Sequence, residues 1–291
     1  MSTATDPDPD ALRERVRGLL DGLVDDAAVF PPALLSVGPA VEAHRAHRLA
    51  WYGEVVGPLL VRASDVGHLL DSTRPGDDLR IGIIADDGLV SLVDAMSRLF
   101  DQDDRATLLQ VEIALPPDHE PARSARVLLD QLSFSTTAYV ELPRGEGPDG
   151  WLGALDVLAE DGAERAKLRT GGAGGAPSEA ELAAFVRACL DRRLPFKLTA
   201  GLHHAVRGAT AEGDQHGFLN VLAAVQAGQE GASTAELAQL LGVRSVEPLL
   251  DLLARADVPR VRRSFTCFGC CRVTDPVDDL HALGLLTPDG G

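Results

Sequence analysis

Short apolar runs alternate with amphipathic stretches along the whole 291-residue chain, and this alternation constrains the fold most strongly. Each run ends near Pro, Gly or Asp and is followed by a helical pattern, as in repeated βα units. No glycine fingerprint of an open dinucleotide-binding sheet follows the first run, and the spacing is fairly even. We therefore predict an α/β fold, a (β/α)8 TIM-type barrel. The eight predicted strands are 24–30, 58–63, 79–85, 108–115, 137–142, 166–170, 195–200 and 261–268.

The stretches between the strands have a period near 3.6 and predict helices. A further helix over 9–22 precedes the first strand, and Ser178 to Glu181 reads as a capping box. The connection between strands seven and eight spans about 60 residues, too long for a single crossover, so it is expected to be an extended helical connection. Residues 1–8 are predicted to be a disordered acidic tail and 9–291 a single domain. The predicted helices are 39–52, 89–100, 120–132, 150–160, 178–192, 218–227, 234–241 and 246–256.

The net charge of -17 disfavours nucleic acid and anionic membrane as partners and favours a small-molecule ligand. The first residues lack the basic start and apolar stretch of a signal peptide, and no apolar run reaches bilayer length. We therefore expect a cytoplasmic protein. Its four cysteines do not resemble a secreted disulfide framework, so reduced thiols are expected. A homo-oligomer is left open.

Lysine is scarce in this chain: of 27 basic residues, 25 are arginine and only Lys167 and Lys197 are lysine. Arginine keeps its charge under all ordinary conditions, whereas a desolvated lysine can lose its proton and form a Schiff base with a carbonyl. The two lysines lie on predicted strands six and seven, and we interpret them as markers of an active site. The alternative is that two lysines have simply survived by chance.

Other charged residues lie near the ends of the predicted strands, where the site of such a barrel is located. Buried charges are costly unless paired, so we expect Glu112 and Glu141 to lie near the lysines. Lysines close to each other and to Arg169 should depress one another's pKa, as imine chemistry requires. The alternative interpretation is a buried ion-pair network that only stabilises the barrel.

Strand six reads Lys167-Leu-Arg-Thr-Gly171 and strand seven Lys197-Leu-Thr-Ala-Gly201, and this pair resembles the lysine strands of the deoxyribose-phosphate aldolase family. The resemblance implies that Lys167 forms the Schiff base and that Lys197 tunes it. The first strand contains Asp25-Asp, which is similar to that family's Asp-His-Thr opening but lacks its His and Thr. Glu112 would stand for the family's strand-four aspartate. The segments at 25–32 and 199–204 also resemble a bacterial protein family without assigned activity, which implies no function.

The glycine-rich loop 171–177 runs into a helix start, where backbone amides and the helix dipole could hold a phosphate or carboxylate. Glycine loops are also plain connectors. The candidate substrate-binding residues at the strand ends are Arg169, Thr170, Gly171, Gly172, Thr199, Gly201, Gly269, Arg62 and Asp86.

Three histidines follow strand seven: His203, His204 and His216. His203 or His204 could act as an acid/base catalyst, or the three could bind a metal with a carboxylate such as Asp86 or Glu141. The cysteines at 267, 270 and 271 lack a second C-x2-C, so buried thiols are favoured over a structural zinc site, and a nucleophilic Cys270 is an alternative.

The segment 233–263 has a helix-turn-helix-like pattern, but it is barely basic, so outer barrel helices are favoured over DNA binding. We predict an aldolase-like Schiff-base lyase acting on a small carbonyl compound that bears a phosphate or carboxylate, without a cofactor. Lys167, Lys197, Glu112, Glu141, His203 and His204 would be catalytic. The alternatives are a metal-assisted hydrolase or isomerase using the histidines, and a non-catalytic ligand sensor or DNA-linked regulator.

Overall fold

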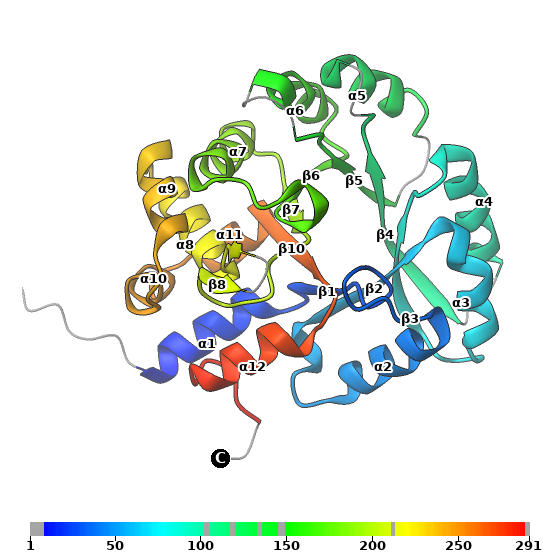
Figure 1. Ribbon diagram of the computed structural model, residues 1–291, viewed down its shortest axis with the longest axis horizontal. Coiled ribbons are helices and arrows are strands. Elements are labelled where there is room, and N and C mark those ends of the chain that lie inside the picture. Colours follow the sequence, from blue (N-terminus) through cyan, green and yellow to red (C-terminus); the bar gives the residue numbers. More distant parts are fainter. Residues whose placement is uncertain are drawn as a thin grey trace, which may run out of the picture.

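The computed structural model describes residues 9–101, 105–116, 120–132, 136–144, 149–210 and 213–288. In this part of the chain, eight parallel strands close into a barrel, and each strand pairs with the strand of the next βα unit (Figure 1). β10 pairs with both β7 and β1 and so closes the ring, which confirms the predicted (β/α)8 barrel. The barrel strands are β1 (Val24–Asp26), β2 (Val56–Arg62), β3 (Leu79–Ile84), β4 (Ala106–Ala114), β5 (Thr137–Glu141), β6 (Arg165–Arg169), β7 (Phe196–Thr199) and β10 (Phe265–Cys270).

The helices form a ring around these strands (Figure 1). Strands covered on both faces are apolar almost throughout, and β2 shows this, since all its residues but the last are buried. The main hydrophobic core lies between the outer strand faces and the helices, where Leu59 and Ile81 are fully buried. The helices are α1 (Pro9–Leu20), α2 (Val37–Leu49), α3 (Val66–Ser72), α4 (Gly88–Phe100), α5 (Pro121–Leu129), α6 (Asp149–Asp161), α7 (Glu179–Arg192), α8 (Phe218–Gln229), α9 (Thr234–Gly242), α10 (Glu247–Leu253), α11 (Val258–Ser264) and α12 (Thr274–Ala282).

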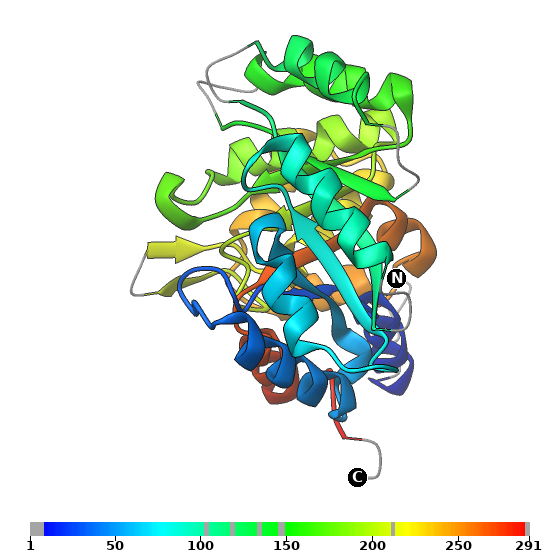
Figure 2. The ribbon, with the colours of Figure 1, turned by 90° about the vertical axis from the view of Figure 1, so that its right-hand side faces the viewer.

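The connection between β7 and β10 contains the three predicted helices, α8 to α10, and two elements that were not predicted. One is a hairpin of β8 (Gly208–Thr210) and β9 (Gly213–Gln215), which projects from one end of the barrel (Figure 2). The other is α11, which occupies the first half of the predicted eighth strand. Asp257 caps α11 by accepting a hydrogen bond from the Arg260 amide, so the chain becomes extended only at Phe265.

The helix-turn-helix-like segment belongs to the outer layer of the barrel. Leu237 and Leu241 of α9 and Leu249 and Leu253 of α10 are fully buried, so the apolar faces of both helices turn inward. This confirms the expectation of outer barrel helices. No helix in the described ranges combines the length and the apolar character needed to cross a bilayer. The predicted acidic tail, residues 1–8, lies outside the described residues.

Candidate active site

Six charged side chains form a chain of alternating sign that runs from the carboxyl-terminal rim into the barrel. At the rim, Arg169 Nε lies 3.1 Å from Glu141 Oε1. Glu141 Oε2 lies 2.6 Å from Lys167 Nζ, which is also 2.5 Å from Glu112 Oε2. The other oxygen of Glu112 lies 2.6 Å from Lys197 Nζ, and Lys197 also donates to Asp25 Oδ2. We call these six residues the ionic chain.

The connectivity of the strands places the ionic chain inside the barrel. β4 is not a neighbour of β6 or β7 in the sheet, yet Glu112 of β4 contacts the lysines of both. Likewise β10 separates β1 from β7, and Asp25 still contacts Lys197. Side chains of non-adjacent strands can meet only across the barrel interior. The predicted closeness of both glutamates to the lysines is therefore confirmed.

Exposure falls steadily along the ionic chain. The side chain of Arg169 is 45% exposed and that of Glu141 is 16% exposed. Lys167 follows with 3%, and Glu112 and Lys197 have no exposed surface. Lys167 is therefore the lysine closest to the barrel mouth, separated from solvent by one carboxylate and one guanidinium.

The pKa shifts of Glu112 and Lys197 favour the charged form of both groups. Burial alone would raise the pKa of Glu112, but the two lysines outweigh burial and hold it at about 2. Burial likewise opposes the charge of Lys197, yet the carboxylates of Asp25 and Glu112 keep its pKa well above 10.5. The prediction that the two lysines depress one another's pKa is wrong for Lys197, because the attraction of the Asp25 and Glu112 carboxylates outweighs the effect of burial.

A polar shell surrounds the inner end of the ionic chain. Gln110 Nε2 donates to Asp25 Oδ2 over 2.8 Å, and the Cys267 thiol donates to the same oxygen over 3.3 Å. Burial raises the pKa of Cys267 to about 12, so this thiol stays protonated. The Lys197 ammonium lies 5.1 Å from the ring centroid of Tyr139. The shell compensates part of the cost of burying Asp25 and Lys197.

A cavity of about 320 Å³ opens at the carboxyl ends of β6 and β7. Several predicted substrate-binding residues line it, namely Thr170, Gly171, Gly172 and Gly201, together with His203. The Thr170 hydroxyl is not available to a ligand, because it donates to the carbonyls of Thr199 and Ala200.

The two glycines that end these strands are required by close backbone packing. A Cβ atom on Gly171 would lie 2.6 Å from the Ala200 carbonyl oxygen. Gly201 has a φ of +113°, and a Cβ atom there would lie 2.8 Å from the Thr170 carbonyl oxygen. These glycines therefore hold the two strand ends together and shape the cavity.

The three histidines do not converge on the ionic chain or on one another. His203 Nδ1 lies 3.1 Å from Asp275 Oδ2 of α12, and His204 Nδ1 lies 3.2 Å from Asp279 Oδ2. His216 Nε2 lies 2.8 Å from the buried carbonyl of Pro177. Of the three, only His203 lines the cavity at the carboxyl ends of β6 and β7.

The metal-ligand interpretation of these histidines gains no support from their placement. Within the described ranges, no three His, Cys, Asp or Glu side chains are grouped as metal ligands. The expected acid/base role of His204 is not supported either, because Asp279 and the neighbouring helix hold its ring outside the cavity lining.

The remaining predicted binding residues occupy different positions. Arg62 lies over the Phe30 ring at 4.6 Å and pairs with Asp65, while Asp86 accepts hydrogen bonds from the amide and hydroxyl of Ser64. These contacts stabilise the loops after β2 and β3 and leave Arg62 and Asp86 outside the ionic chain. Thr199 and Gly269 pair with each other at the end of β7 and β10.

Comparison with known proteins adds no assignment to this geometry. No protein-family model matches the sequence, and no curated protein is significantly similar to it. A functional proposal for this protein therefore rests on the fold and the ionic chain.

Proposed function

We propose that the protein is a carbon–carbon lyase of the class I aldolase type, in which Lys167 forms a Schiff base with a small carbonyl substrate. The observation that supports this most is the position of Lys167 between Glu112 and Glu141, directly below the rim. Active sites of (β/α)8 barrels lie at this end of the strands. The resemblance of both lysine strands to the deoxyribose-phosphate aldolase family points to the same residue.

Lys197 suits a different role. It is fully buried, and its raised pKa keeps it an ammonium, so it cannot act as a nucleophile at neutral pH. It shares the Glu112 carboxylate with Lys167. A permanent cation on the far oxygen offsets part of the negative charge of Glu112 that faces Lys167.

The rim end of the ionic chain couples substrate binding to deprotonation of Lys167. Burial raises the pKa of Glu141, but Lys167 and Arg169 together hold it below its ordinary value. An anionic substrate group would attract the half-exposed Arg169 guanidinium away from Glu141. Glu141 would then lose one of its two cations, its pKa would rise, and it could accept a proton from Lys167.

The neutral amine would attack the carbonyl carbon of the substrate, and loss of water would give an iminium ion. The iminium withdraws electrons, so the carbon–carbon bond next to it can break. Glu141, a carboxylate again after giving its proton to the departing water, would accept the proton of a β-hydroxyl group on the substrate. The fragment with this hydroxyl leaves as a carbonyl compound, and the other stays as an enamine that Glu141 can protonate. Protonation of the enamine and addition of water would release the second product and restore Lys167. Phosphate or carboxylate on the substrate would be held by Arg169.

Reductive trapping tests this proposal. The full-length protein is incubated with acetaldehyde, pyruvate or glyceraldehyde 3-phosphate and reduced with borohydride, and the adduct is located by intact mass and peptide mapping. We expect one adduct, on Lys167. The Lys167→Arg variant keeps the charge and the N-terminal amine but should form no adduct.

The outcomes separate catalysis from a purely structural ionic chain. If the ionic chain only stabilises the barrel, Lys167→Arg will lower the free energy of unfolding while none of the three compounds is trapped by the wild-type protein. An adduct on Lys197 would also contradict the assignment, as would full lyase activity in the Lys167→Arg variant.

A further inference from the structure

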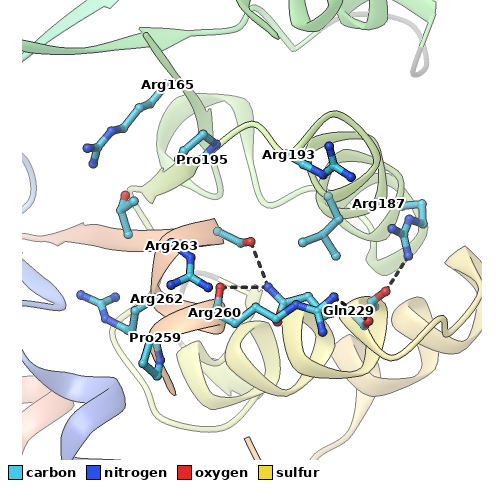
Figure 3. A pocket seen from close by; sticks show the side chains of 13 residues that line it. Arg165, Arg187, Arg193, Pro195, Gln229, Pro259, Arg260, Arg262 and Arg263 are labelled. Carbon is cyan, nitrogen blue, oxygen red and sulfur yellow. Dashed lines mark hydrogen bonds between the residues drawn. The ribbon is translucent and has the colours of Figure 1, made fainter. Parts of the chain in front are cut away.

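A second cavity lies at the opposite end of the barrel from the mouth. It has a volume of about 760 Å³, within the range of small-molecule sites. Its wall includes Arg165, the first residue of β6, Pro195 just before β7, and Thr266 near the start of β10. It therefore opens at the amino-terminal ends of these strands, between the end of α7, the end of α8 and α11 (Figure 3).

The charge of this cavity is opposite to that of the protein. The whole chain has 44 acidic and 27 basic residues, so an average surface hollow should contain more carboxylates than guanidinium groups. No Asp or Glu is among the described residues that line this cavity. The arginines surround its opening from β6, the end of α7 and α11 (Figure 3). They are Arg165, Arg187, Arg193, Arg260, Arg262 and Arg263.

Contacts within the fold account for only part of this cluster. Three of the arginines bond to main-chain carbonyls: Arg187, Arg260 and Arg262 donate to the carbonyl oxygens of Gly228, Gln229 and Phe265. Such contacts are typical of helix ends and need no ligand. They neutralise no charge, and of the six only Arg187 forms an ion pair in the described ranges, with Asp191. The carboxylates of Glu230 and Asp21 act on Arg260 and Arg262 from farther away.

The other three arginines have fewer fold contacts. Arg165 donates to the Tyr139 hydroxyl, which is uncharged. The exposed side chains of Arg193 and Arg263 make no hydrogen bond or ion pair with any residue in the described ranges. Like charges that outnumber their counter-charges repel one another, so the cluster is stabilised when an anion binds among them.

We propose that this cavity, which we call the arginine cavity, binds a small molecule carrying two or three phosphate groups. Arg187 is paired with Asp191, and carboxylates act on Arg260 and Arg262 from a distance, so three to five of the six positive charges are uncompensated. A phosphate group carries about −1.5 to −2 at neutral pH, so about two or three of them match this charge. Guanidinium groups also bind phosphate oxygens in a bidentate manner. The site is separate from the ionic chain and does not depend on the lyase proposal.

Calorimetric titration of the full chain with inorganic tripolyphosphate in low salt tests the proposal. We expect one tripolyphosphate per chain and an affinity that falls as NaCl is added. Arg263→Gln and Arg193→Gln should each weaken binding by about tenfold, the effect of losing one charge-assisted contact. The matched control is Arg126→Gln, which removes an exposed charge on α5 and should leave the affinity unchanged.

Three results would overturn the proposal. The first is an absence of binding to the wild-type protein, and the second is equal affinity in the Arg263→Gln, Arg193→Gln and control variants. The third is a tighter complex with citrate or with a short DNA duplex than with tripolyphosphate, because a carboxylate ligand or a nucleic acid would then fit the cavity better. Thermal melts of each variant establish that the substitutions leave the fold intact.

Discussion

At the scale of single residues, the axis of this barrel departs from the usual packing of (β/α)8 proteins. Bulky branched apolar side chains normally fill the interior in layers. Here Asp25, Glu112 and Lys197 fill it instead, each almost completely removed from solvent. Burying a charge costs several kcal/mol unless a partner compensates, so each member of the ionic chain depends on its neighbours.

The pKa shifts of the ionic chain predict the pH dependence of stability. Glu112 has a pKa of about 2 in the folded chain against 4.5 ordinarily, so its contribution is present above pH 4.5 and is lost as the pH falls towards 2. The loss should be on the order of 3 kcal/mol. The pKa of Lys197 is raised, so its contribution is present below pH 10.5 and is lost at higher pH. Urea unfolding across this pH range measures both effects.

The variant Glu112→Gln isolates the acid part of this profile. It should be less stable at pH 7 by about 3 to 5 kcal/mol, because two lysines lose a carboxylate, and its stability should fall less steeply below pH 4.5. Glu247→Gln, an exposed change on α10, serves as the control with an unaltered profile. An acid slope in Glu112→Gln as steep as in the wild type would show that Glu112 does not carry the effect.

Sequence reasoning identified the lysines, both glutamates and Arg169, because charged residues on apolar strands are conspicuous. Asp25 was named only as part of the resemblance to the aldolase family, without a role in the site, and Gln110 was missed. Strand alternation offered a signal for both: one of two adjacent aspartates in β1 had to face inward, and Gln110 shares the face of Glu112. The partners of His203 and His204 could not be predicted, because α12 is far away in sequence.

At the scale of elements, the ends of β6 and β7 are fixed by contact between their backbones. Gly171→Ala should lower the free energy of unfolding by about 1 to 3 kcal/mol, since its Cβ would meet a carbonyl that cannot move freely. Gly150→Ala in α6 is the matched control, with no atom within 4 Å of the new Cβ, and should be neutral or slightly stabilising. Urea unfolding compares the two; equal effects would refute the packing argument.

Capping residues and apolar periodicity predicted the existence of most helices and strands better than their boundaries. Ser178 does cap α7, but Glu181 turns to Arg144 instead of completing the predicted capping box. A complete capping box occurs at α9, between Ser233 and Glu236. The eighth strand was predicted to begin four residues too early, because apolar and basic residues before Phe265 fit either a strand or a helix.

At the scale of the whole molecule, negative charge on the surface opposes compaction. With a net charge of -17, mutual repulsion among carboxylates should destabilise the folded chain at low ionic strength. We expect the melting temperature to rise by a few degrees between about 0.02 and 0.3 M NaCl, because salt screens surface charges but hardly affects the buried ionic chain. Calorimetry across this NaCl series measures the melting temperature. A melting temperature that falls as salt is added would mean that attraction within surface ion pairs outweighs the repulsion among carboxylates.

The ionic chain also constrains how this sequence can evolve. Its three cations and three anions balance, so a neutral substitution of any one of its buried members leaves an unpaired charge inside the barrel. Loss of a neighbouring cation and anion together restores neutrality. In relatives of this protein, we therefore expect a cation and its neighbouring anion to be substituted together. The first substitution of each pair would be tolerated only in a chain whose free energy of unfolding is large enough to absorb the loss.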